Sequence, residues 1–594
     1  MLKAGTNILV PSIAKLFNIV LSSQSFPLEW NITAITPLHK KGSQFDTDNY
    51  RGISITSCLG KCFTSIMANR LMSCIETSKI FPDNQAAFRK NMRTTDHIYT
   101  LKSIINKYCL KQKSTLYACF VDLKKAFDSV WREALLLKLL RLGINDQFYF
   151  LIKSMYQNTT ACVKLPLGLT DTFNINLGIR QGDCLSPILF NLFINDISSI
   201  FTNDCNPVAL GQCNINYLLF ADDLLMLSES ASGLQHSLNN LDSYAKKWCL
   251  DINTKKTKVL VFQRFGRKPE VNFKFGSNKV ETAKTYTYLG VTFDGNCNFK
   301  SAANDLKIKG TKASFKLSSA LSSLNHINVK THTKLFDALI RSIISYGCEV
   351  WLPDLFYKES CPISKKLDTI TCEKVHNSFC KRILNIYKSS PNALARQELG
   401  RLPLLAFTSL QIVKYWSHVL EKPRDSILYQ AYLSEVEYDS KWIRFVKYFL
   451  NLYKLDNHWQ TQTPLSKKQI NLIKPSLYEV FHITSLDTKI PTYLTEYQNE
   501  SAVLKVAIYL QYDISQTKKR AITKLRLRSN RLEVISGRYT RPITPLLNRI
   551  CKICKTGIDD EQHFFTQCSV LNALREKFYV EIKNFIPYFP ILSH

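Results

Sequence analysis

The sequence predicts an α+β fold, because strand and helix signals are mixed along the chain without the strict strand–helix alternation of parallel sheets. Four short apolar runs rich in β-forming residues predict strands, at residues 116–121, 217–220, 224–227 and 258–262. Helical patterns dominate from about residue 300 to 450, for example at 333–345. The first 110 residues predict helices broken by turns, and the Leu-rich stretch 135–142 predicts a further helix.

The chain is apolar enough to bury a large core and is strongly basic. Its 594 residues are 45% hydrophobic, which excludes wholesale disorder. The formal net charge of +31 attracts polyanions. Nucleic acid is therefore the expected partner, with an acidic membrane surface as the weaker one and an ordinary basic protein as the alternative. We find neither a signal-peptide pattern nor a run of 18 apolar residues, so we expect no membrane span and reduced cysteines.

Three carboxylates follow the predicted strands. Asp122 ends the run 116–121, while Asp222 and Asp223 lie in the short link between 217–220 and 224–227, which predicts a tight hairpin. Ordinary turn residues are the alternative interpretation. A like-charged pair at a hairpin tip repels itself, however, and Mg²⁺ relieves that repulsion. With Asp122 beside the hairpin, three carboxylates would surround two cations, which suits in-line phosphoryl transfer.

The residues around these carboxylates resemble the reverse transcriptases of non-LTR, jockey-like retrotransposons over roughly residues 20–300. Residues 120–128 resemble the family's first catalytic motif, 178–187 its template- and nucleotide-contacting motif and 220–223 its catalytic hairpin. The resemblance implies a right-hand polymerase with fingers, palm and thumb. It divides the chain into fingers and palm at 1–294, a helical thumb at 295–400, a helical connecting region with a basic run at 401–540, and a zinc element at 541–594.

The resemblance also implies the roles of the acidic motif. Asp122, Asp222 and Asp223 would hold two Mg²⁺ ions, with Mn²⁺ as a substitute. One ion would activate the primer 3′-hydroxyl and the other would hold the triphosphate. Phe127 occupies the position at which the family places a bulky side chain against the sugar 2′ position, where it would exclude ribonucleotides. A plain core Phe is the alternative.

Further positions match motifs that contact nucleotide, template or primer. Residues 35–42, 49–54 and 84–89 are similar to fingers motifs, although Ala87 replaces the family's usual Gly. Nucleotide or template contacts are expected from Lys40, Lys41, Arg51, Arg180, Gln181 and Gly182, with a solvated face or a surface turn as the alternative. Lys256, with Lys258 as second choice, would protonate the pyrophosphate leaving group. The primer-grip turn is matched by Tyr288, Leu289 and Gly290, for which ordinary hairpin residues are the alternative.

A second constellation lies near the C-terminus. Cysteine is absent from residues 381–550, and then Cys551-x₂-Cys554-x₈-His563-x₄-Cys568 offers three thiolates and an imidazole. This is a tetrahedral Zn²⁺ set, with free thiols as the alternative. It is similar to the C-terminal Cys/Cys/His/Cys element of non-LTR elements and predicts one structural Zn²⁺. Upstream, 518–541 contains nine basic residues and one acid, and the alternation at 524–528 predicts a strand with a basic face for nucleic-acid phosphates, or a solvated surface.

These observations predict an RNA-directed DNA polymerase whose partners are an RNA template, a DNA primer or target and dNTPs, without a membrane. The oligomeric state is left open. Because the chain starts only about 120 residues before Asp122, we expect a truncated copy. The alternative is a retroelement remnant that only binds nucleic acid. An intron-type maturase is a third interpretation, against which the zinc set argues. The family's chromosomal target implies the nucleus and cytoplasm, although no clear targeting signal is present.

Overall fold

A central β-sheet of six strands organises the N-terminal half of the chain. We describe it from a computed structural model, in which the described residues are 5–40, 42–322, 328–356, 367–473, 477, 505–512, 514–527, 529–538 and 540–585. The strand order is β12-β13-β11-β3-β10-β9. The strands are β3 (Leu116–Asp122), β9 (Tyr217–Phe220), β10 (Asp223–Ser228), β11 (Lys258–Phe262), β12 (Phe273–Phe275) and β13 (Asn278–Ala283). The four strands predicted from apolar runs are therefore confirmed.

Strand β3 lies in the interior of this sheet and pairs antiparallel with both β10 and β11. Its side chains alternate between two hydrophobic cores, one on each face of the sheet. Leu116, Ala118 and Phe120 enter the first core. Tyr117, Cys119 and Val121 enter the second. A strand buried on both faces needs apolar residues at every position, which explains the unbroken apolar run that predicted it.

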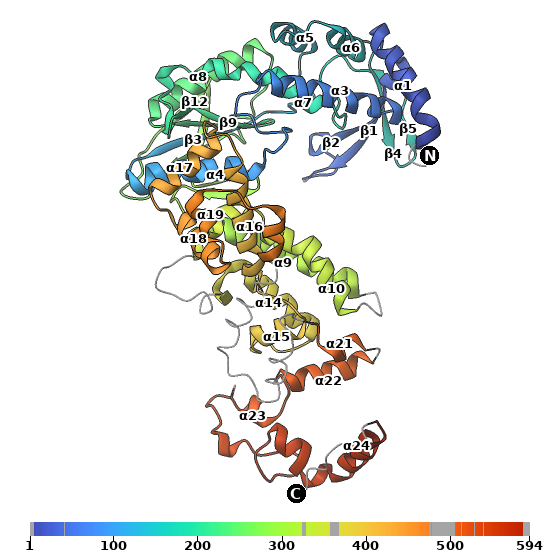
Figure 1. Cartoon of the computed structure of the whole chain (residues 1–594), viewed down its shortest axis with the longest axis vertical. Coiled ribbons are helices and arrows are strands. Elements are labelled where there is room, and N and C mark those ends of the chain that lie inside the picture. The colour runs from blue at the N-terminus through green and yellow to red at the C-terminus, as the bar shows by residue number, and fades with distance from the viewer. Residues whose placement is uncertain are drawn as a thin grey trace.

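Helices cover both faces of the central sheet (Figure 1). The second core is built with α3 (Cys58–Thr77), α5 (Arg132–Arg141), α6 (Gln147–Tyr156), α7 (Ser186–Ile194) and α8 (Ala231–Lys247). The first core contains α4 (Thr94–Ile105) and helices that follow residue 300. The Leu-rich helix predicted at 135–142 corresponds to α5.

A smaller sheet of five strands has the order β2-β1-β4-β5, with β6 paired to β4. Its strands are β1 (Ile32–His39), β2 (Tyr50–Ile55), β4 (Thr160–Leu165), β5 (Gly168–Leu169) and β6 (Phe173–Asn174). Strands β1 and β2 lie where the sequence predicted only helices and turns, so that prediction is wrong for them. Their side chains are mostly half-exposed, and such strands lack the continuous apolar signal of a buried strand.

Between residues 300 and 452 the described part of the chain is mostly helical, as predicted. It follows the hairpin of β14 (Thr285–Tyr288) and β15 (Val291–Asp294). The helices are α9 (Lys300–Ser322), α10 (Val329–Phe336), α11 (Ser342–Ile344), α12 (Cys348–Phe356), α14 (Thr371–Leu384) and α15 (Asn392–Glu398). A π-helical turn at Asp337–Arg341 joins α10 to α11, so the helix predicted at 333–345 is also confirmed.

Helices α16 (Leu404–Leu420), α17 (Ile427–Glu437) and α18 (Lys441–Leu452) pack against α4 and share the first core with the sheet. Figure 1 shows them next to α4, with α19 (Asp456–Thr461) beside them. A buried ion pair joins the two parts: Lys102 Nζ on α4 lies 3.3 Å from Glu435 Oε2 on α17, and both side chains are 1% exposed. Helices α16 to α18, the first part of the predicted connecting region, therefore belong with the central sheet and its covering helices to one unit, which we call the central body. The four domain boundaries stay predictions.

The C-terminal part extends away from the sheets (Figure 1). It contains α21 (Ile508–Gln511), α22 (Gln516–Arg526), α23 (Glu533–Ser536) and α24 (Asn572–Phe585). The strand predicted from the alternation at 524–528 is wrong, because most of this stretch ends helix α22, and Arg528 lies outside the described residues. Lys, Arg and Leu are strong helix formers, and Ser515 accepts a hydrogen bond from the Lys518 N–H at the N-terminus of the helix.

The N-terminal helix α1 (Thr6–Ser23) differs from the expectation of no membrane-length apolar segment. By length and composition it is apolar enough to cross a membrane, and only 11% of it is buried. Polar residues interrupt its sequence, which is why no continuous apolar run marks it. A single helix of this kind near the N-terminus is weak grounds for a membrane span, because signal sequences and core helices share these properties. The absence of a membrane partner remains a prediction.

Candidate active site

The three predicted carboxylates meet at one end of the central sheet. Asp122 is the last residue of β3 and Asp223 the first of β10, and these two residues are direct partners across the paired strands. Asp222 immediately precedes Asp223 and lies in the two-residue turn Ala221–Asp222 that joins β9 to β10. The sequence prediction of a hairpin with carboxylates at its tip beside Asp122 is therefore confirmed.

The carboxylates repel one another. Desolvation by the surrounding protein, followed by the charges of Asp222 and Asp122, raises the pKa of Asp223 to about 6. Desolvation and the charge of Asp122 also raise the pKa of Asp222, against its backbone hydrogen bond and the charge of Arg51. Oxygen ligands that disfavour their own ionisation in this way fit a divalent cation, which stabilises their charged forms.

A buried glutamine that the sequence analysis did not single out supports the hairpin turn. Gln85 is 2% exposed, and its side-chain Oε1 accepts a hydrogen bond from the Ala221 N–H at 3.3 Å. Residues 84–86 pair with β9, because the Leu219 N–H donates to the Asn84 carbonyl at 2.8 Å. Ala221 has φ = 57°, a left-handed conformation that residues other than glycine rarely adopt. The contact from Gln85 therefore helps to hold the turn that presents Asp222.

A cleft of about 870 Å³ opens beside Asp122 and Asp222. Most of the predicted contact residues line it, namely Lys40, Arg51, Phe127, Gln181, Gly182 and Lys256. Lys41 lies outside the described residues. The cleft also contains Lys125, which the sequence analysis did not assign and whose Nζ lies 2.9 Å from Asp48 Oδ1. Cationic side chains facing carboxylates across an open cleft suit a ligand that carries both phosphates and metal ions.

Gln181 and Gly182 are fixed by contacts with β2 and with the loop that follows β3. The Gln181 carbonyl accepts a hydrogen bond from the Ser54 N–H of β2 at 2.8 Å. The Gln181 side chain donates through Nε2 to Asp128 Oδ1 at 3.0 Å. Gly182 has φ = 115°, and a Cβ there would lie 2.8 Å from the Ser54 carbonyl oxygen, so only glycine fits this close approach.

Arg180 does not face the cleft, so the predicted nucleotide or template contact of its side chain is wrong. The guanidinium is buried and donates through Nη2 to Asn31 Oδ1 at 2.7 Å and to the Met155 carbonyl at 3.1 Å. It also lies 5.8 Å from the ring centroid of Tyr156. Arg180 therefore anchors the segment from the protein interior, while its neighbour Gln181 points the other way.

The two lysines considered as proton donors differ in their surroundings. Lys256 Nζ lies 3.6 Å from Asp122 Oδ2 and lines the cleft. Lys258 Nζ lies 2.6 Å from Glu281 Oε2 on β13 and is engaged there. The geometry favours Lys256, the first choice from the sequence, and its role as a general acid stays a prediction.

Two aromatic side chains lie near the carboxylates, one from the loop after β3 and one from β14. Phe127 is half-buried and stacks on Phe190, with ring centroids 4.9 Å apart, while it also lines the cleft. Tyr286 of β14 stacks on Phe120 of β3 at 4.3 Å. Desolvation, followed by the charges of Asp223 and Asp122, raises the pKa of Tyr286 to about 12. Tyr286 was not predicted, and it shows that the β14–β15 hairpin lies close to the carboxylates.

The predicted primer-grip residues form the turn of this hairpin. Tyr288 is the last residue of β14, and Leu289 (φ = 45°) and Gly290 (φ = 86°) make the two-residue turn into β15. Left-handed conformations at both positions are typical of a type I′ hairpin turn. The contact of this turn with a primer stays a prediction.

The predicted zinc ligands also converge. One ligand atom from each of Cys551, Cys554, His563 and Cys568 lies within 4.8 Å of the others, a separation that suits a single ion bound at about 2.0–2.3 Å. Cys554 Sγ lies 3.1 Å from His563 Nε2. The pKa of the Cys554 thiol is lowered to about 6, and the hydrogen bond from the Thr556 side chain is the largest cause. A lower pKa favours the thiolate, which is the form that binds metal. The four residues therefore fit a metal ion.

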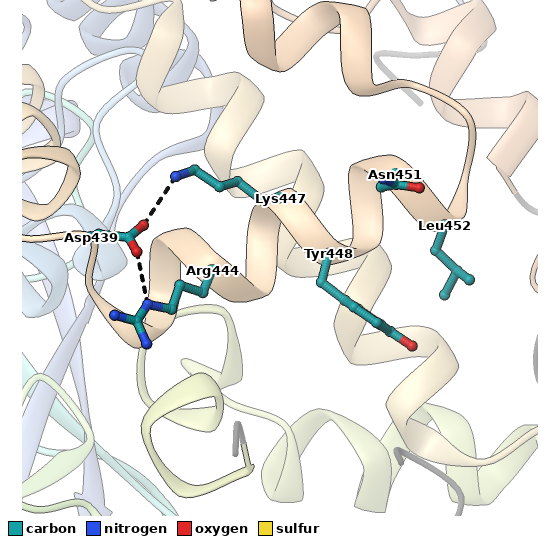
Figure 2. Close-up of a pocket in the computed structure, with 6 residues that line it drawn as sticks. All are labelled: Asp439, Arg444, Lys447, Tyr448, Asn451 and Leu452. Carbon is teal, nitrogen blue, oxygen red and sulfur yellow. Dashed lines mark hydrogen bonds and ion pairs between the residues drawn. The ribbon is translucent and has the colours of Figure 1, made fainter. Parts of the chain in front are cut away.

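A second hollow is lined by Asp439 and by residues of α18 (Figure 2). Figure 2 shows Arg444 and Lys447 pointing to Asp439, to which their Nε and Nζ atoms lie at 2.9 Å and 3.0 Å. The carboxylate neutralises part of the positive charge in this hollow. It lacks the group of like-charged carboxylates that marks the first cleft, which remains the candidate active site.

Comparison with known proteins agrees with this geometry. Residues 38–293 match the family described as reverse transcriptase (RNA-dependent DNA polymerase). The chain is 26% identical over 348 residues to the RNA-directed DNA polymerase from the mobile element jockey of Drosophila melanogaster, a match that covers 57% of this chain and 37% of that protein. It is 28% identical over 275 residues to the retrovirus-related Pol polyprotein from the type-1 retrotransposable element R2 of Nasonia vitripennis, covering 46% of this chain and 26% of that protein.

The chain spans well under half the length of these curated relatives. Among solved structures, apo telomerase from Candida tropicalis is similar with a TM-score of 0.35 and 14% identity, covering 68% of this chain and 69% of that chain. This structural similarity is too low to support an argument, and the family match rests on the sequence.

Proposed function

We propose that this chain, whose residues 38–293 form a reverse transcriptase domain related to those of non-LTR retrotransposons, extends a primer 3′-hydroxyl on an RNA template. The observation that supports this most strongly is the meeting of Asp122, Asp222 and Asp223 beside the cleft. The test is primer extension by the purified chain on an RNA template with dNTPs and Mg²⁺. Binding of the primer–template without extension would support the alternative, a remnant that only binds nucleic acid.

In the proposed reaction the primer 3′-oxygen forms a bond to the α-phosphorus of a dNTP, and the bond to pyrophosphate breaks. Two Mg²⁺ ions held by the three carboxylates would supply Lewis-acid stabilisation of the attacking and leaving oxygens. Arg51 and Lys40 offer positive charge to the triphosphate from the cleft wall. Lys256, held near Asp122, is positioned to give its proton to the departing pyrophosphate.

The proposed partners are an RNA template and a DNA primer. The net charge of +31 supports binding to nucleic-acid backbones. The jockey relative named above is an RNA-directed DNA polymerase, which supports RNA as the template and DNA as the product. Because backbone contacts release counterions, the affinity for primer–template should fall as salt increases.

Phe127→Ala is expected to weaken discrimination against ribonucleotides. Phe127 lines the cleft near Asp122 and Gln181, and removing its ring would make room for a 2′-hydroxyl. Selectivity for dNTPs over rNTPs should fall by about tenfold or more, measured as the ratio of single-nucleotide incorporation efficiencies. Unchanged selectivity, together with loss of stability, would support the alternative that Phe127 is an ordinary core residue stacked on Phe190.

We also propose that Cys551, Cys554, His563 and Cys568 bind one structural Zn²⁺. The set has four protein ligands, which is typical of structural rather than catalytic zinc. The surrounding backbone supports it: Gly557 has φ = 68°, and a Cβ there would lie 2.9 Å from His563 Nδ1. The Cys551 N–H donates to the Gly557 carbonyl at 3.1 Å, which closes a loop around the cysteines.

Cys568→Ser is expected to abolish zinc binding and unfold the segment around the cluster. Structural zinc contributes about 10 kcal/mol of folding free energy in small zinc domains, so the loss of one thiolate should be decisive. The chain should contain one zinc by elemental analysis and the variant none. Cys74→Ser is the control, since Cys74 is exposed on α3 and away from the cluster. Equal zinc content in the wild-type chain and Cys568→Ser would contradict the assignment.

A further inference from the structure

One tyrosine hydroxyl connects three parts of the molecule. Tyr346 lies between α11 and α12, and its hydroxyl donates to the Leu289 carbonyl at 3.0 Å, in the turn of the β14–β15 hairpin. The same oxygen lies 3.1 Å from Thr94 Oγ1 at the start of α4. Because a phenol has a single hydrogen to donate, the Thr94 hydroxyl is the donor in the second contact. The bonds therefore run from Thr94 through Tyr346 to Leu289.

The ring of Tyr346 packs directly on the same turn. A Cβ at Gly290 would lie 2.8 Å from Tyr346 Cε1, and one at Gly347 would lie 3.0 Å from Val291 Cγ2. Both glycines have positive φ, and neither leaves room for a side chain. The turn at residues 289–290 and the loop around Tyr346 are therefore in close contact. The buried Trp351 donates through Nε1 to the Tyr346 carbonyl at 2.9 Å, which fixes Tyr346 to α12.

This contact reaches the candidate active site through the hairpin. Tyr286 on β14 stacks on Phe120, which lies two residues before Asp122 on β3. The turn that Tyr346 contacts therefore belongs to a hairpin that packs on the strand ending in a predicted metal ligand. Through Tyr346, Thr94 connects the same turn to α4, a helix of the first core.

We propose that Tyr346 is a positioning residue that holds the turn of residues 288–290 against the helices after residue 300, and so keeps the primer terminus at the carboxylates. This inference rests on the proposed function. Loss of the hydroxyl should leave chemistry at the carboxylates intact but allow the primer to move away between additions. The expected defect is that the enzyme adds fewer nucleotides to the primer each time it binds the primer–template.

The test is Tyr346→Phe, which keeps the ring over Gly290 and removes only the hydroxyl. Processivity, measured as product length in the presence of a trap for free enzyme, should fall about fivefold, the effect of one neutral hydrogen bond. The rate of a single nucleotide addition should stay within about twofold. Tyr509→Phe is the matched control: Tyr509 is also half-buried, and its hydroxyl bonds to Thr523 Oγ1 at 2.8 Å, far from the hairpin.

Thr94→Val supplies a second variant. It should shorten products in the same direction, and the double variant with Tyr346→Phe should be no worse than Tyr346→Phe alone, because both changes break one chain of bonds. The dissociation rate of labelled primer–template, which needs no extension, should rise about fivefold in Tyr346→Phe. Unchanged processivity and dissociation would overturn the inference. If the wild-type chain binds but does not extend, the proposed function fails, and the dissociation rates still decide the role of Tyr346.

Discussion

Asp222→Asn should abolish primer extension. The side chain lies in the turn Ala221–Asp222, beside the paired Asp122 and Asp223. Asparagine has nearly the same shape but no negative charge, so the site would lose the attraction that holds two divalent cations. Because metal ions contribute several kcal/mol of transition-state stabilisation, we expect extension to fall by about a thousandfold or more. Extension of an end-labelled primer on an RNA template measures this effect.

Asp251→Asn provides a control in the same cleft. Asp251 lines the cleft as well, but its side chain is 61% exposed and pairs with Lys124 at 2.8 Å. The loss of an exposed ion pair should change extension by only a few-fold. Primer–template affinity should be similar in both variants, because neither carboxylate is needed for backbone contacts. Equal extension by Asp222→Asn and the wild-type chain would indicate a contaminating polymerase and refute the proposed metal site.

Glu435→Gln should strongly destabilise the central body. Glu435 accepts hydrogen bonds from Lys102 Nζ at 3.3 Å and Asn106 Nδ2 at 2.8 Å, and both charged side chains of the pair are 1% exposed. Removing one charge leaves Lys102 buried, and among the described residues Asp354, 3.8 Å away, is then its remaining carboxylate partner. Breaking a buried pair typically costs about 3–5 kcal/mol, which denaturant unfolding followed by tryptophan fluorescence would report.

The double variant Lys102→Met/Glu435→Gln tests the cause. It removes both charges and retains an acceptor for Asn106, so much of the lost stability should return. If the double variant is no more stable than Glu435→Gln, the cost arises from altered packing and not from an unpaired charge. Because the pair joins α4 to α17, the same measurement tests whether the helices after residue 400 stabilise the sheet that presents the carboxylates.

The central sheet was predictable because its strands are buried on both faces. Apolar runs such as 217–220 and 258–262 then appear in the sequence without any knowledge of the fold. Strands β1 and β2 gave no such signal, since most of their residues are half-exposed and pairing between backbones stabilises them. The alternation at 524–528 does not produce a strand, because Lys, Leu and Arg are strong helix formers and Lys524, Leu525 and Arg526 continue helix α22.

The parts of the candidate site that depend on residue type could be predicted from the sequence. The parts that depend on which way a side chain points could not. The three carboxylates and the four zinc ligands have side chains whose grouping has few other purposes. Arg180 and Gln181 are neighbours in one motif, yet one faces the interior and the other the cleft, and the sequence offers no signal for this difference. Gln85 was missed because its role arises only when residues 84–86 pair with β9, more than 130 positions away.

The alternation of β3 between two cores has a consequence for how the molecule opens. One core contains helices from the first 250 residues, and the other contains later helices as far as α21 and reaches Leu527. Neither set of helices can separate from the sheet without exposing one side of the same strand, so local unfolding of either one destabilises the other. The end of β3 that presents Asp122 thus belongs to one cooperative unit formed by segments more than 300 residues apart. Fluctuations of the cleft must come from the loops around it and not from the strand beneath.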